Sequence, residues 1–182
     1  MLELLRYYLQ ENLIKNVTAD DVATLAQKVL LIFKEVTETF DVRSTYSWNS
    51  SHLKDLCENI KWYSPGNVNE VILALYAQME IIFRNRLTED DERAQFDAIA
   101  RKHLNIESDV YYKMIQRGDG VYLEAVTYPT WYQNMQMLIN QCLTDDEKTF
   151  SDSGIEVCKE LSQLCPAIAL ALNGNVVTCV SA

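Results

Sequence analysis

The feature that constrains this chain most is an apolar run, Val71–Phe83, interrupted only by Gln78 and Glu80. A helix over this run has apolar side chains on nearly all its faces, and such a helix is buried either in a helical domain or in a membrane. Its thirteen residues fall short of the roughly 20 that cross a bilayer. The sequence therefore predicts a central helix over residues 67–86, buried among other helices.

Polar residues mark the ends of this helix. Asn67 can cap the free amides, and Glu70 has the spacing of a capping box. Arg84 lies near the other end, four residues after Glu80 and on the same side of the helix. An uncompensated buried carboxylate costs several kcal/mol. We therefore expect Glu80 to pair with Arg84 or to reach solvent between neighbouring helices; the alternative is a functional carboxylate in a pocket.

Amphipathic spacing predicts further helices around this one. They cover residues 2–14, 18–40, 50–63, 88–103, 105–117, 130–142 and 153–172, and Pro166 kinks or breaks the last of them. With five Gly and three Pro in 182 residues, the composition favours helices joined by short loops. We therefore expect an all-α fold, a single compact bundle of about seven or eight helices over residues 1–174. Residues 119–129 fit an extended segment and a helical turn equally well.

The C-terminal residues differ from the predicted bundle. Val176–Val180 is β-prone and apolar, and it follows a helix stop at Asn173-Gly174. We expect residues 175–182 to form a tail that docks on the chain's own core or on a neighbouring subunit.

The charge and the cysteines limit the partners and the compartment. Sixteen basic and twenty-six acidic residues give a net charge of −10 and a pI near 4.6. Without a basic cluster, nucleic-acid binding is not expected, and an acidic surface favours a basic protein partner. Five cysteines without close pairs and an N-terminus without a signal-peptide pattern indicate a reducing, cytoplasmic setting. No membrane association is expected, and a homo-oligomer is left open.

Two acidic clusters follow threonines. Glu89 and Asp90 come after Thr88, and Asp145 and Asp146 come after Thr144. The four consecutive acids of the first cluster, Glu89–Glu92, could bind a divalent cation. Helix capping by the preceding threonine explains both clusters more simply. We therefore predict no metal site here, with Thr88 as the N-cap of its helix.

The residues do not form a known catalytic or cofactor motif. With two histidines, His52 and His103, the chain lacks the pairs of a zinc or di-iron site. Phosphate-binding and dinucleotide motifs are also absent from the sequence, so we predict no cofactor. A Cys-His pair through Cys57, or a core carboxylate at Glu80, is the enzymatic alternative.

Aromatic residues in predicted loops point to protein binding. Tyr46, Trp48 and Tyr128 fall in connecting segments, where they either cover the core or face a partner. With the acidic clusters they form our candidate interface: Tyr46, Trp48, Tyr128, Glu89, Asp90, Asp145 and Asp146.

The function that these features favour is a non-enzymatic acidic helical protein that binds another protein. Inhibitors, antagonists and adaptors belong to this class, and immunity proteins and virus-encoded host antagonists share the profile. The alternative is a self-assembling structural subunit of a capsid or filament, in which the tail would contact a neighbouring copy.

Overall fold

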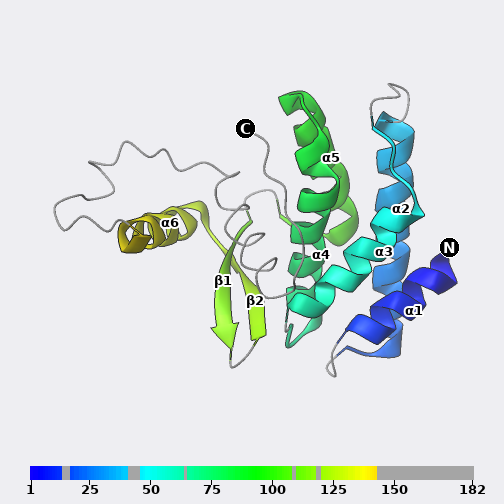
Figure 1. Ribbon diagram of the computed structural model, residues 1–182, viewed down its shortest axis with the longest axis horizontal. Helices are drawn as coiled ribbons and strands as arrows, with labels where there is room; N and C mark the ends of the chain where they lie inside the picture. The colour runs from blue at the N-terminus through cyan, green and yellow to red at the C-terminus, as the bar shows by residue number, and fades with distance from the viewer. Residues whose placement is uncertain (14–16, 41–45, 64, 108–109, 118–119, 143–182) are drawn as a thin grey trace. The chain divides into compact units, whose positions relative to one another are not determined.

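The structure is a computed structural model, shown in Figure 1, that describes residues 1–13, 17–40, 46–63, 65–107, 110–117 and 120–142. The chain divides into two compact units, one made of residues 1–108 and 115–123 and the other of residues 109–114 and 124–182. We call these unit 1 and unit 2. The predicted helix over residues 153–172 and the predicted tail over residues 175–182 lie outside the described residues.

The described part of the chain is mostly helical, as predicted. Seven of the seven or eight helices expected over residues 1–174 fall within it, and there the structure has six α-helices and a two-stranded sheet instead. The elements are α1 (Leu2–Asn12), α2 (Ala19–Phe40), α3 (Ser50–Asn59), η2 (Ile60–Trp62), α4 (Val68–Ile82), η3 (Arg84–Arg86), α5 (Asp90–Leu104), β1 (Tyr111–Arg117), β2 (Gly120–Val126) and α6 (Tyr128–Cys142).

Helix α4 confirms the prediction of a buried central helix. Its buried residues cover every side: Val71, the run 73–80 and Ile82. The Asn67 side chain accepts a hydrogen bond from the Glu70 backbone N–H at 3.0 Å, and the Glu70 carboxylate accepts one from the Gly66 N–H at 2.6 Å. Helices α3 and α5 pack against α4. A sequence that is apolar all round a helix thus forms the core of unit 1.

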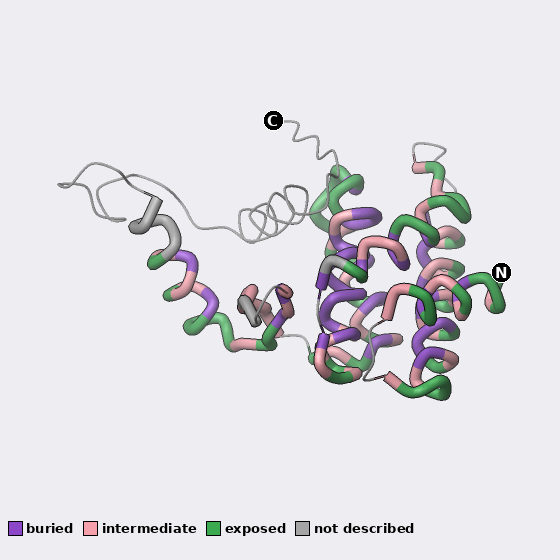
Figure 2. Tube along the Cα trace, turned by 60° about the horizontal axis from the view of Figure 1, so that its bottom comes forward, coloured by how far each residue is buried: buried purple, intermediate pink, exposed green. Residues whose placement is uncertain are grey.

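The remaining helices of unit 1 pack on one another as well as on the core. Helix α2 contacts α1 and α5, and α1 also contacts α3. In Figure 2 buried segments recur along α2, separated by intermediate and exposed ones. The buried residues of α2 are Val22, Leu25, Ala26, Val29, Ile32, Val36 and Phe40. Thr18 caps α2 as predicted, since its hydroxyl accepts from the Asp21 N–H at 3.2 Å.

The predicted helix over residues 105–117 was wrong, because residues 111–117 form strand β1. The spacing of the apolar residues from 110 to 115 fits a helix, but Tyr111 and Tyr112 also favour a strand. Strand β2 supplies the pairing partner, and Lys113 and Glu124 form an ion pair between the strands at 2.9 Å. Pairing with a later segment therefore decides the conformation here.

The segment that the sequence left undecided is extended over β2, and α6 follows it directly. In unit 1, Val121 of β2 forms a parallel bridge with Tyr63. In unit 2, Tyr111 contacts Trp131 of α6, with ring centres 5.1 Å apart, and Trp131 and Met135 are buried. None of the described helices combines the length and the apolarity needed to cross a membrane.

Candidate protein-interaction surface

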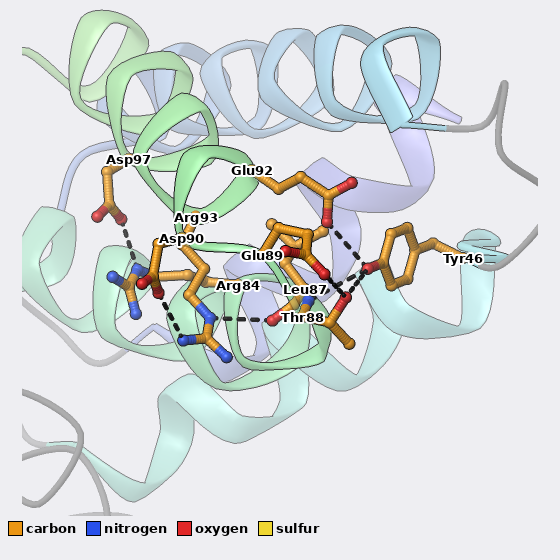
Figure 3. Close-up of polar contacts among 9 residues, drawn as sticks. All are labelled: Tyr46, Arg84, Leu87, Thr88, Glu89, Asp90, Glu92, Arg93 and Asp97. Carbon is orange, nitrogen blue, oxygen red and sulfur yellow. Dashed lines mark hydrogen bonds and ion pairs between the residues drawn. The ribbon is translucent and has the colours of Figure 1, made fainter.

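The loop before α3 is fastened to the start of α5 by one tyrosine hydroxyl (Figure 3). The Tyr46 hydroxyl accepts a hydrogen bond from the Thr88 backbone N–H at 3.1 Å and donates one to the Glu92 carboxylate at 3.0 Å. It also lies 3.1 Å from the Thr88 hydroxyl. Tyr46 and Thr88 are 42 residues apart in the chain, so folding alone brings these groups together.

The two aromatic residues of this loop form a stack that lies on the core. The rings of Tyr46 and Trp48 are nearly parallel, at 7°, with centres 5.7 Å apart. Trp48 in turn meets Phe40 and Phe83 edge-on, each at 5.8 Å. Trp48 therefore covers the core, and one face of Tyr46 covers Trp48. Both aromatic residues are partly exposed.

Acidic residues at the start of α5 lie beside this aromatic pair. The N-cap of α5 is Glu89, without a side-chain capping bond, so the prediction of Thr88 as the cap was wrong. The Thr88 hydroxyl is bonded to Tyr46 instead of a helix amide. Glu89, Asp90 and Asp91 are exposed, and these carboxylates complement the positive end of the helix dipole.

One cation lies among these acids. The Arg93 guanidinium donates to the Leu87 carbonyl at 2.9 Å and forms an ion pair with Asp90 at 3.1 Å. The Asp90 side chain is nevertheless 97% exposed, so its carboxylate can still meet another molecule. We call Tyr46, Trp48, Thr88, Glu89, Asp90 and Asp91 the acidic–aromatic surface.

The structure thus brings together four of the seven candidate interface residues, Tyr46, Trp48, Glu89 and Asp90. Tyr128 belongs to unit 2, where it is half-exposed and packs against Tyr111, Trp131 and Tyr132. Asp145 and Asp146 lie outside the described residues.

The two residues predicted as a buried polar pair lie in a larger buried cluster of α4, η3 and α5. Arg84 forms an ion pair with Asp97 at 2.9 Å (Figure 3), and the Tyr76 hydroxyl donates to Asp97 at 3.3 Å. Arg101 donates to the Tyr76 hydroxyl at 3.2 Å. Glu80 is 0% exposed, so it does not reach solvent between helices.

The charges of this cluster influence one another strongly. Burial by itself would lower the pKa of the Arg84 guanidinium, but the nearby Asp97 and Glu80 carboxylates outweigh burial and raise that pKa. Burial raises the pKa of the Tyr76 hydroxyl, and the same two carboxylates raise it further. The cluster has two acidic residues, Glu80 and Asp97, and two basic ones, Arg84 and Arg101. Equal numbers of acidic and basic groups suit an ionic cluster within a core.

Sequence reasoning missed Asp97 and Glu92. Asp97 directly follows Phe96, which is on the predicted inner side of its helix, and it precedes Arg101 by four residues. This signal could have indicated a buried ion pair, because the acid is next to an inner-face residue and a cation follows one helical turn later. Glu92 stands in an acidic run, and its sequence context does not distinguish it from its exposed neighbours.

The cysteine and histidines that could form a nucleophile are engaged otherwise. Cys57 is fully buried, and burial raises the pKa of its thiol to about 12. His52 accepts a hydrogen bond from the Asn49 N–H at 3.1 Å as part of the α3 cap, and His103 lies 2.5 Å from a Glu35 carboxylate oxygen. Within the described ranges, groups of three or more His, Cys, Asp or Glu suited to a metal do not occur.

Comparison of this chain with protein-family models, with curated protein sequences and with solved structures finds no match.

Proposed function

We propose that this chain is a non-enzymatic binding protein, of the inhibitor, antagonist or adaptor type, that holds a basic protein partner on its acidic–aromatic surface. One observation supports the proposal: the aromatic pair Tyr46 and Trp48 lies beside three exposed carboxylates, although the two segments are 42 residues apart in the chain. The carboxylates are those of Glu89, Asp90 and Asp91. Aromatic anchors beside a polar rim are typical of protein interfaces.

The surface is held in place before a partner binds. Hydrogen bonds of the Tyr46 hydroxyl to Thr88 and Glu92 and the stack on Trp48 fix the Tyr46 ring. A side chain that is already ordered loses little entropy in a complex. A partner's arginine suits this surface, because a guanidinium can lie on an aromatic ring and pair with a carboxylate.

Charge favours a basic partner over a neutral one. The chain has a net charge of −10, and the carboxylates of Glu89, Asp90 and Asp91 concentrate negative charge on one surface. Such a field attracts a positive protein and speeds its association, most strongly at low salt. The proposal places the protein in the cytoplasm, where an odd number of cysteines stays reduced.

The enzymatic alternatives have less support. A thiol with a pKa of about 12 is almost entirely protonated at neutral pH, and the thiolate is the nucleophilic form. Glu80 is fully buried within the core, where a substrate does not reach it without local opening. Neither Cys57 nor Glu80 therefore offers a group that is ready to react.

A charge-reversal experiment tests the proposal. Wild-type chain and the double variant Glu89→Lys/Asp90→Lys are used to capture partners, and the captured protein is then titrated by calorimetry at several salt concentrations. The matched control is Glu38→Lys/Asp55→Lys, which reverses two exposed acids on α2 and α3. We expect the control to bind a basic partner nearly as tightly as wild type and the first variant to bind at least tenfold more weakly. Equal binding by both variants, or an acidic partner, would refute the proposal.

A further inference from the structure

Helix α1 has a second apolar side, which is exposed among the described residues of unit 1. Leu5 and Leu9 are buried against its neighbours, whereas Met1 is 60% exposed, Leu4 50% and Tyr7 57%. Residues three apart in a helix lie on the same side, so these three side chains form one stripe. In Figure 2 the helix at the N-terminus accordingly shows exposed and buried residues in alternation.

This stripe is more than scattered exposure. The described residues expose six large apolar side chains: Met1, Leu4, Tyr7, Leu31, Tyr128 and Met137. Single exposed apolar residues are normal on a monomer, but contiguous ones mark interaction sites. Half of the six lie on the eleven-residue helix α1 and its N-cap, Met1.

The charges beside the stripe are mainly negative. Glu11 is exposed in the last turn of α1, and the Glu3 side chain is 83% exposed. Arg6, the cation of the helix, forms an ion pair with Glu3 at 3.1 Å, which leaves the exposed Glu11 carboxylate and the net charge of −10 to attract a cation. A partner that covers the stripe therefore meets carboxylates and gains from bringing cations.

We propose that the outward stripe of α1, formed by Met1, Leu4 and Tyr7, is a docking surface separate from the acidic–aromatic surface, and that it takes a basic amphipathic helix of another protein. Two helices pack by fitting the side chains of one between those of the other, and apolar residues three apart on α1 suit that packing. The helix is already held by α2 and α3, so docking does not require it to fold.

A second copy of this chain fits the stripe less well. Three side chains at these exposed fractions offer on the order of 300 Å² of apolar surface, below the roughly 800 Å² that each partner buries in a stable complex, so charge attraction has to add to apolar burial in any complex that uses the stripe. Each copy also has a net charge of −10, so two copies repel. A basic helix avoids the repulsion and can add contacts of its own beyond the stripe.

A membrane surface also fits poorly. Helices that lie on membranes are rich in Lys and Arg on their polar side, which bind anionic lipids. Helix α1 has one cation, Arg6, against the acids Glu3 and Glu11. Its polar side would be repelled by an anionic membrane.

The test uses the full chain, labelled with ¹⁵N, and two synthetic 18-residue amphipathic peptides, one of Leu and Lys and one of Leu and Glu. We expect the Leu–Lys peptide to shift the amide signals of α1 and the Leu–Glu peptide to leave them unchanged. Leu4→Ser and Tyr7→Ser should each weaken the Leu–Lys complex by about tenfold, because each removes apolar surface that the complex covers.

The control variant is Leu31→Ser, which removes a partly exposed leucine of α2 and should bind the Leu–Lys peptide as wild type does. Far-ultraviolet circular dichroism checks that each variant is folded. Several results would overturn the proposal: unchanged affinity in folded Leu4→Ser and Tyr7→Ser, equal binding of the Leu–Glu peptide, or a dimer in sedimentation that needs Leu4. Shifts confined to Tyr46, Trp48 and Glu89 would also overturn it, while leaving the acidic–aromatic surface as the binding site.

Discussion

Removing one partner of the buried Arg84–Asp97 pair should destabilise the fold strongly. The side chains are 9% and 19% exposed and 2.9 Å apart. Loss of one member of a buried pair costs about 3–5 kcal/mol, because the other charge stays in the core. For Asp97→Asn we expect about 3 kcal/mol, the lower end of that range, since Asp97 retains some contact with solvent and the Glu80 carboxylate still attracts Arg84.

The corresponding shift of the melting temperature is about 6–12 °C, given roughly 2–4 °C per kcal/mol for a chain of this length. Urea denaturation followed by circular dichroism measures the free energy of unfolding directly. Asp90→Asn is the matched control, because it removes a carboxylate that is likewise paired with an arginine, at 3.1 Å, but is 97% exposed. It should cost less than about 1 kcal/mol.

The double variant Arg84→Met/Asp97→Asn separates the pair from its surroundings. With both charges gone, the combined loss of stability should be smaller than the sum of the two single losses by about 1–3 kcal/mol. Additive losses within about 0.5 kcal/mol, or equal losses for Asp97→Asn and Asp90→Asn, would contradict the assignment of a coupled buried pair.

Three further predictions concern other contacts. Tyr46→Phe removes the hydroxyl bonded to Thr88 and to the buried Glu92, and should lower the free energy of unfolding by about 1–3 kcal/mol in urea denaturation; a loss under about 0.5 kcal/mol would contradict the described hydrogen bonds. Hydrogen bonds from His103 and Lys102 lower the pKa of Glu35 below its usual 4.5. Ionised Glu35 therefore stabilises the fold above pH 4.5, and this contribution is lost as the pH falls through the lowered pKa. Glu35→Gln should flatten the acid side of the curve of unfolding free energy against pH, and an unchanged curve would refute the linkage. Cys57, with a thiol pKa of about 12, should resist iodoacetamide at pH 8 in the folded protein and react in urea, as followed by mass spectrometry of its peptide; rapid alkylation without urea would show that the thiol is accessible.

Local signals in the sequence were sufficient for the helices. The apolar run of α4 and its Asn67 cap, and the regular stripe of α2 after Thr18, are decided within each segment. The strand over residues 111–117 could not be predicted in this way, because its backbone pairs with β2 and the local spacing fits a helix as well.

The candidate surface was predictable in composition but not in arrangement. Residue type alone identified Tyr46, Trp48, Glu89 and Asp90. That the Tyr46 hydroxyl meets Thr88, and so prevents the threonine from capping α5, depends on a contact across 42 residues. Likewise, spacing within one helix indicated Glu80 as a neighbour of Arg84, but it could not indicate the ion pair that Arg84 forms with Asp97 of the following helix.

The Tyr46 hydroxyl is bonded to Thr88, just before α5, so the acidic–aromatic surface is a discontinuous epitope. Its aromatic part and its acidic part come from separate segments, and neither segment has the complete recognition element. A short peptide copied from residues 88–95 should therefore compete poorly for the proposed partner, and libraries of linear peptides would miss the proposed interaction. Antibodies that recognise this epitope would report the native conformation, and a partner that depends on it would release the protein when unit 1 unfolds.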